Sequence, residues 1–425
     1  MPELPTSQES LTPEKSRKPK SVMALVIDFL SSFKLATVLI LLLMMLTWLA
    51  TLEQVKEGLH ATLNKYFTIQ QFFVLCNLET DWLDVPLVIP LPGGWWVLAL
   101  LFVNLLIGGI IRARKTPKKI FIFIAHCGIL LMVLSAAVTQ FYEERGTMDF
   151  FEGQTSNVAQ DYYEHVIEVA EHTNGNPTEF NVIRGKNFMD LTAGEKRTVR
   201  LPNLPFDLEL RRYAVDSEVR SAAMLPPADK QPVIDGYYIF PKKSNENAEL
   251  NVGACYAKIL PKSGGDVTEC ILTSQISDPN GITRPAFTVR VDGRVFTVDM
   301  RKFLWVMPFS VRLDRAVAKY YPNTNKPESF ESTVTRLENN TEAVAEIRMN
   351  EPMRYEGMTF YQRMMGRRQA ASDSTPYSQL EVVRNPADKW PEYALYVVTV
   401  GLVMHFLLRL VLTIKSTLKR FSTPV

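Results

Sequence analysis

Residues 120–135 read Ile120-Phe-Ile-Phe-Ile-Ala-His-Cys-Gly-Ile-Leu-Leu-Met-Val-Leu-Ser135, an almost unbroken apolar run with His126 near its middle. With the residues that follow, the run is long enough to cross the hydrocarbon core of a bilayer as a helix. An ionisable side chain at that depth is costly, and such side chains usually mark functional sites. The stretch therefore predicts a membrane-spanning helix with a functional residue inside it.

Three further segments of the 425-residue chain have the length and apolar character of membrane spans. Hydrophobic residues make up 47% of the chain, and they are concentrated in these runs rather than spread evenly, which is typical of an integral membrane protein. The first run is too long for a signal peptide, and no small-residue cleavage pattern follows it. The predicted transmembrane helices cover residues 22–52, 95–111, 120–141 and 392–414.

Basic residues mark one side of these spans. They precede the first span, fill the short loop 112–119 and follow the last span, whereas the loop 53–94 carries mainly acidic residues. The positive-inside rule then places both termini in the cytoplasm and the large region 142–391 outside it. Residues 1–21 have the composition of a disordered cytoplasmic tail, and residues 415–425 form a second cytoplasmic tail.

The region 142–391 alternates apolar and polar residues in many short stretches, such as residues 206–210 and 295–300, separated by Gly, Pro, Asn and Asp. Asp292-Gly293 stands between two such stretches and predicts a tight hairpin. We expect about a dozen antiparallel strands packed as one or two sandwiches. The predicted fold class is a membrane protein with four transmembrane α-helices and a large extracytoplasmic all-β domain.

The cysteines and the usual catalytic motifs exclude several functions. The four cysteines form no CxxC pair, and no Cys/His cluster has the spacing of a zinc site. Cys255 and Cys270 fall in one predicted hairpin, where a disulfide and two free thiols are the alternatives. No Ser/His/Asp grouping, phosphate loop or HExxH helix is apparent, so the sequence does not support enzyme chemistry by this chain alone. A net charge of +2 gives no case for nucleic acid.

Several elements together resemble the ResB-type (ResB/CcsB) component of the system II cytochrome c biogenesis machinery. The resemblance runs over nearly the whole chain, and the element at 350–362 is the most specific. The elements are Ser31-Ser-Phe-Lys-Leu-Ala-Thr-Val-Leu, Asn104, His126-Cys-Gly-Ile-Leu-Leu, Glu152-Gly153, Asn350-Glu-Pro-Met-Arg-Tyr-Glu-Gly-Met-Thr-Phe-Tyr-Gln362 and Val383-Arg-Asn-Pro386.

The resemblance implies a membrane partner of the CcsA/ResC type, with which the chain carries haem b outward as a substrate and presents it to apocytochromes c. Thioether formation would belong to the complex, and thiol-reducing proteins would be functional neighbours because the acceptor cysteines must be reduced. The chain resembles the half without the partner's tryptophan motif. Trp95-Trp96 directly follow Pro92-Gly-Gly, and we interpret them as interfacial anchors.

His126 is predicted to be an axial ligand of the haem iron, because imidazole is a common haem ligand and the resemblance implies a haem-ligating histidine in this span. The alternative for His126 is a helix–helix hydrogen bond. His405, in the last span at a comparable depth, is a second candidate, with a partner-supplied ligand as the alternative. The loop 112–119 either only sets topology or also pairs with haem propionates. Three extracytoplasmic histidines show no ligand spacing and are interpreted as surface or core residues: His60, His165 and His172.

Two rival hypotheses come from other classes of protein. A transporter permease would need a cytoplasmic surface for an ATPase, and the loop 112–119 is short for that purpose. A membrane-anchored sensor or adhesion module would explain the β-rich region and treat His126 as packing. The Phe360-Tyr361 pair is interpreted as scaffold that packs the end of the domain against the membrane or partner.

Overall fold

The computed structural model describes residues 21–78, 87–113, 115–173, 175–191, 194–225, 231–275, 285–339, 341–367 and 376–421. The predicted tail 1–21 lies outside these residues except for Ser21, and so does the predicted tail 415–425 from residue 422 onward. The chain divides into two units. The membrane unit comprises Met1–Thr47, Ile69–Leu134 and Lys389–Val425, and the β unit comprises Trp48–Thr68 and Ser135–Asp388.

In the part of the chain that the structure describes, four helical segments are long and apolar enough to cross a membrane, as the sequence predicts: Phe33–Glu57, Gly94–Ile111, Ile120–Tyr142 and Trp390–Leu418. The protein is therefore a membrane protein. The helices of the described residues are α1 (Val22–Leu30), α2 (Phe33–Glu57), α3 (Leu59–Phe67), α4 (Gly94–Asn104), the π-helical turn η1 (Leu105–Ile111), α5 (Ile120–Tyr142) and α6 (Trp390–Phe421).

The helix bounds differ from the predicted spans in three places. Helix α6 continues to Phe421, past the predicted end at residue 414 and into the predicted tail 415–425. The predicted span 22–52 is divided at Ser31-Ser32, where the Ser31 hydroxyl donates to the Ile27 carbonyl at 2.7 Å and the Ser32 hydroxyl accepts from the Leu35 amide at 3.2 Å. These side chains compete with the helical backbone, so α1 ends and α2 begins there. The predicted loop 53–94 contains the end of α2, all of α3 and the hairpin of β1 (Phe73–Leu78) and β2 (Leu87–Pro92).

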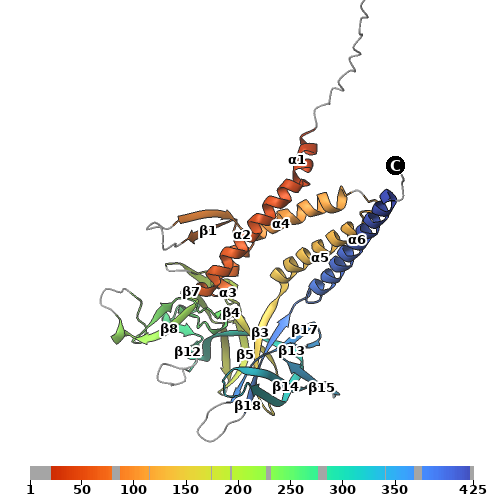
Figure 1. Ribbon diagram of the computed structural model, residues 1–425. Helices are drawn as coiled ribbons and strands as arrows, with labels where there is room; N and C mark the ends of the chain where they lie inside the picture. Colours follow the sequence, from red (N-terminus) through yellow and green to blue (C-terminus); the bar gives the residue numbers. More distant parts are fainter. Residues whose placement is uncertain are drawn as a thin grey trace, which may run out of the picture. The chain divides into compact units, whose positions relative to one another are not determined.

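Helices α5 and α6 lie side by side in the membrane unit (Figure 1). Two glycines permit the contact: a Cβ added at Gly128 would lie 2.9 Å from the Ala394 carbonyl oxygen, and one added at Gly401 would lie 2.7 Å from the Ala125 amide nitrogen. Small residues at such positions let helix backbones approach closely in a membrane. The small residues Ala125 and Gly128 are compatible with either a bound macrocycle or a close neighbouring helix. In the structure, α6 is the close neighbour.

The β unit is built from antiparallel strands, as predicted. Its strands among the described residues are β3 (Glu144–Phe151), β4 (Thr155–Thr173), β5 (Asn176–Ile183), β6 (Lys196–Val199), β7 (Phe206–Ala214), β8 (Asp216–Ser221), β9 (Tyr237–Lys242), β10 (Ala254–Pro261), β11 (Thr268–Thr273), β12 (Phe287–Val291), β13 (Arg294–Tyr320), β14 (Pro327–Glu338), β15 (Thr341–Arg348), β16 (Met353–Tyr355), β17 (Met358–Arg367) and β18 (Pro376–Arg384).

The long strands β4 and β13 pair with each other and form the centre of a ten-stranded sheet with the order β15-β14-β13-β4-β3-β18-β17-β16. On this sheet β12 pairs with β13, and β5 pairs with β4. A separate sheet has the order β11-β10-β7-β6, and β8 pairs with β9. The predicted Asp292-Gly293 hairpin is confirmed: β12 pairs with the start of β13, and the two turn residues have φ of 48° and 77°.

Two hydrophobic cores lie along the β4–β13 pair. The first packs the β11-β10-β7-β6 sheet against β12 and the first part of β13, with the Phe206 and Phe296 rings in edge contact at 5.2 Å. The second is enclosed by the later part of β13 and by β14 to β18, where β14 and β15 also contact β17. These strands form one lobe in Figure 1. One long sheet thus contributes to two sandwich-like cores. This agrees with the predicted one or two sandwiches.

Candidate functional site in the membrane unit

His126 is half-buried on α5 and contacts the π-helical turn η1. Its Nδ1 atom lies 3.3 Å from the Gly109 carbonyl oxygen. Gly109 belongs to the last turn of that helix, where carbonyls lack intrahelical partners. Because a carbonyl can only accept a hydrogen bond, this contact requires the imidazole tautomer with its proton on Nδ1. The predicted alternative of a helix–helix hydrogen bond is therefore present, and it leaves the lone pair on Nε2.

The Nε2 atom of His126 is the one suited to a metal ion. Among the described residues, no hydrogen bond engages it. A histidine that ligates a metal ordinarily donates its other ring nitrogen to a carbonyl or carboxylate, which fixes the tautomer and the ring orientation. The Gly109 carbonyl supplies such a partner here. Hydrogen bonding to the neighbouring helix and ligation of haem iron are therefore compatible roles for one side chain.

A second face of the same helical segment contacts the break between α1 and α2. Asn104 is buried, and its side-chain amide donates to the Leu30 and Ser32 carbonyls at 2.6 and 3.1 Å. Four residues later, a Cβ at Gly108 would lie 2.9 Å from the Ser31 carbonyl oxygen. Four residues later again, Arg112 donates to the Asp28 carboxylate at 2.7 Å and the Ser31 hydroxyl at 2.8 Å. Asn104, Gly108 and Arg112 thus hold the α1–α2 break against one face of the segment. Gly109 contacts His126.

A π-helical turn widens the helix locally and is frequent at functional sites. The adjacent glycines Gly108 and Gly109 let both neighbours approach the backbone, one from each side. The hydropathy of the segment predicts only a span. The signal that could have revealed the turn is the glycine pair inside an apolar run.

His405 lies on α6, and its Nδ1 atom is buried without a hydrogen-bond partner among the described residues. The α5–α6 contact brings Gly401 to the level of Ala125, beside His126 in the sequence. His405 lies four residues beyond Gly401, about 6 Å further along the helix axis. No contact between described residues joins the two histidines, so a second axial ligand from His405 stays a prediction.

The basic loop and the paired tryptophans have local partners. Arg112 pairs with Asp28 at the α1–α2 break, and the Lys115 ammonium lies 5.6 Å from the Phe123 ring centroid. Trp96 stacks on Phe72 at 4.8 Å and donates its ring N–H to the Ile69 carbonyl at 3.1 Å. These contacts hold Trp96 against the turn that precedes β1.

The three remaining histidines lie in the β unit and have ordinary partners. His60 on α3 stacks on Tyr163 at 3.9 Å, and His172 lies 3.0 Å from the Thr297 hydroxyl. His165 is buried in the core, where its Nδ1 atom lies 2.9 Å from the Tyr213 hydroxyl and its Nε2 accepts from the Gly253 amide. No group of three or more His, Cys, Asp or Glu side chains in the described part of the chain could hold a metal ion.

The burial of His165 predicts an acid-sensitive β unit. Burial, with a smaller contribution from Lys302, lowers the pKa of His165 from 6.5 to about 4. The unfolded chain therefore binds a proton between these values that the folded chain does not, and stability falls as the pH drops from about 6.5 toward 4. The expected loss is up to about 3 kcal/mol. Urea unfolding of the full chain at pH 7 and pH 4.5 should show a larger decrease for the wild type than for His165→Gln. Equal decreases would contradict this assignment.

The predicted Cys255–Cys270 hairpin exists as β10 and β11, but both thiols are free. Cys255 lies opposite Leu272 and Cys270 opposite Ala257, so the two cysteines are offset by two residues in the register. Both are buried in the first core, and burial raises the pKa of the Cys270 thiol to about 12. They are packing residues in this state.

The family-like element 350–362 is scaffold, as interpreted, but its packing differs from the expectation. The Phe360 ring lies in the second core, 6.0 Å from Phe309, rather than facing a membrane or partner. Gln362, also buried, accepts from the Ser332 hydroxyl at 2.6 Å and donates to Ser378 at 3.0 Å. The element therefore connects β14, β17 and β18 inside the domain.

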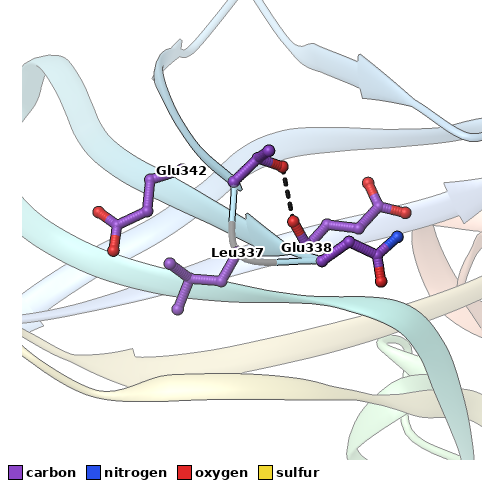
Figure 2. Close-up of a pocket in the computed structure, with 5 residues that line it drawn as sticks. Leu337, Glu338 and Glu342 are labelled. Atoms are coloured by element: carbon purple, nitrogen blue, oxygen red, sulfur yellow. Dashed lines mark hydrogen bonds between the residues drawn. The ribbon is translucent and has the colours of Figure 1, made fainter.

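A pocket at the β14–β15 turn is a feature of the hairpin itself. It is lined by Leu337, Glu338, Asn339, Thr341 and Glu342, which Figure 2 draws as sticks. The Thr341 hydroxyl donates to the Glu338 carbonyl at 2.6 Å. The Glu338 carboxylate accepts from the Tyr355 hydroxyl at 2.5 Å. These contacts hold the turn and bring no catalytic group toward the pocket.

Residues 286–375 match the ResB-like family. The matched stretch begins just before β12, ends just before β18, and includes the 350–362 element. The match supports the resemblance over these residues; the other elements that resemble the family lie outside it. No curated protein matches the chain.

Proposed function

We propose that this chain, whose residues 286–375 match the ResB-like family, is a membrane component of the system II cytochrome c maturation machinery. In this role it works with a CcsA/ResC-type partner, carries haem b across the bacterial inner membrane as a substrate, and presents it to apocytochromes c. Both termini lie in the cytoplasm and the β unit lies outside it. Thiol-reducing proteins keep the acceptor cysteines ready for the complex.

The observation that carries the proposal is the fixed imidazole of His126. Haem iron accepts the lone pair of a neutral histidine, and the Gly109 carbonyl holds the proton on the other ring nitrogen. Seven residues separate His126 from Lys119, so the imidazole lies about 10 Å along the helix from the basic loop. A haem held there would have entered from the cytoplasmic side.

The η1 segment would then act as the positioning element of the haem site. It is packed on one side against the α1–α2 break and on the other against His126. Because Asn104 and Arg112 tie it to α1 and α2, the carbonyl of Gly109 has a defined position relative to α5. The role of this chain is to bind and orient haem, and covalent attachment is the reaction of the whole complex.

Separate substitutions of the two glycines of η1 distinguish the effect of His126 ring orientation on haem binding from the effect of helix packing. A Cβ at Gly109 would lie 2.8 Å from His126 Nδ1, so Gly109→Ala displaces the imidazole. Loss of such a supporting partner should lower haem affinity about tenfold or more. Gly108→Ala is the matched control, because its Cβ meets Ser31 instead. The measurement is haem content per purified chain and the position of the haem absorption band. Equal loss in both variants would attribute the effect to helix packing and contradict the positioning role.

A further inference from the structure

A polar cavity of about 300 Å³ lies in the β unit, at a site shared by none of the residues of the haem proposal. It forms where the register of the β4–β13 pair shifts between Lys302 and Leu304. Such bulges re-aim side chains and are frequent beside functional sites. The side chains used below come from four segments: Tyr162 of β4, Lys302 of β13, Arg363 of β17 and Glu249 of the short turn Ala248–Leu250.

The phenol of Tyr162 is an unmatched hydrogen-bonding group in this lining. Tyr162 is only 6% exposed, and its hydroxyl has no hydrogen-bond partner among the described residues. A buried polar group without a partner is costly and uncommon, so it needs an explanation. Burial raises the pKa of this phenol, which therefore stays protonated and able to donate. The hydroxyl is suited to an acceptor that arrives from outside the domain.

Two cations contact Tyr162, one at its ring and one at its backbone carbonyl. The Arg363 guanidinium lies 5.1 Å from the Tyr162 ring centroid and donates to the Glu249 carboxylate. The Lys302 ammonium donates to the Tyr162 carbonyl at 3.0 Å and to the Glu249 carbonyl. Arginine has five N–H donors and lysine three, so donors remain after these bonds are made.

The acidic side chains of the lining already have donors of their own. Asp161 accepts from the amides of Tyr163 and Glu164 at 2.8 Å each, and Asp149 accepts from the Gln379 side chain at 2.8 Å. Glu249 is paired with Arg363. The donors that remain in the cavity for an incoming group come from Arg363, Lys302 and Tyr162. The domain itself shows which acceptor fits them, because the group now bound to Arg363 is a carboxylate.

We propose that this cavity binds a carboxylate group of a ligand, with Arg363, Lys302 and Tyr162 as donors and with the Glu249 carboxylate as an internal competitor. A bound carboxylate would replace Glu249 on Arg363 and give the Tyr162 hydroxyl its missing acceptor. Charge-assisted hydrogen bonds from arginine are strong. Whether the ligand binds therefore depends on whether its carboxylate replaces Glu249 on Arg363.

The exchange would also affect the C-terminal end of α2, which belongs to the β unit. The segment that carries Glu249 also contacts Gly58: a Cβ there would lie 2.2 Å from the Glu246 carbonyl oxygen. Lys243, at the start of the same segment, donates to the Glu57 carboxylate at 2.8 Å. Release of Glu249 would loosen a segment that is packed against the junction of α2 and α3.

The test is isothermal titration of the purified full chain with succinate, and with a capped peptide that contains one Asp, at matched ionic strength. Wild type should bind weakly because Glu249 competes, and Glu249→Gln should bind about tenfold more tightly because the competing charge is gone. In the Glu249→Gln background, Tyr162→Phe should weaken binding about fivefold, and Arg363→Gln should abolish it. Arg348→Gln, an exposed arginine of the same unit, is the matched control.

The two probes distinguish the source of the carboxylate. Binding of succinate alone assigns a small free acid, and binding of the peptide alone assigns an acidic polypeptide segment. Succinamide, which has the same size without charge, should not bind. Equal binding of succinamide, or no binding of either probe to a Glu249→Gln protein with wild-type thermal stability, would overturn the proposal.

Discussion

Replacement of His126 by alanine should remove nearly all haem from the purified protein. Loss of a partner that merely supports a metal ligand lowers affinity 10- to 100-fold, so loss of the ligand itself should lower haem occupancy by about 100-fold or more. The protein should otherwise fold normally, because the removed ring makes one hydrogen bond, to Gly109. Haem content per chain and the absorption spectrum measure the effect.

Two comparisons make the His126 experiment specific. Imidazole added to His126→Ala membranes should restore part of the haem spectrum, because a free imidazole can enter the space left by the side chain. His172→Ala, in the β unit, should retain wild-type haem content. Full haem retention by His126→Ala would return the residue to a packing role and favour the sensor or adhesion hypothesis.

Phe360→Ala should have the largest effect on stability among single substitutions in the family-like element. The side chain is fully buried in the second core, where it packs with Phe309 and its neighbours. Truncation of a buried phenylalanine leaves a cavity and costs about 3–5 kcal/mol. Denaturant unfolding of the purified chain, followed by tryptophan fluorescence, should show the loss as a lower midpoint.

Phe180→Ala is the matched control for Phe360→Ala, because Phe180 of β5 is 55% exposed. Substitutions at exposed sites usually change stability by less than about 0.5 kcal/mol. A similar midpoint for both variants would mean that the second core does not depend on Phe360. A normal midpoint with lost maturation would instead indicate a partner contact for this element.

The membrane spans and the hairpins could be predicted because their causes are local. Four apolar runs predict the four long helices found among the described residues. Asp292-Gly293 adopts the left-handed backbone that a two-residue turn requires. The break at Ser31-Ser32 was not predicted: the two serine side chains act locally, but the Asn104 amide that also holds the break lies more than seventy residues away in the sequence. The sequence there is equally compatible with one continuous helix.

The candidate residue of the membrane unit could be named from the sequence, but its surroundings could not. His126 stands out because an ionisable group in an apolar run is costly, whereas its partner is a backbone carbonyl of Gly109 that no side-chain pattern announces. The same reason hides the polar cavity of the β unit. Tyr162, Lys302 and Arg363 are ordinary strand residues, and only the register shift between β4 and β13 brings them together.

The central claim is that this chain is required for covalent attachment of haem to cytochromes c. The most direct test is a haem-stained denaturing gel of membranes from cells that lack the chain, because only covalently attached haem survives denaturation. The account predicts that the stained cytochrome bands disappear while immunoblots still detect the apocytochromes, and that the wild-type chain restores the bands. Unchanged bands in the deletion strain would contradict it.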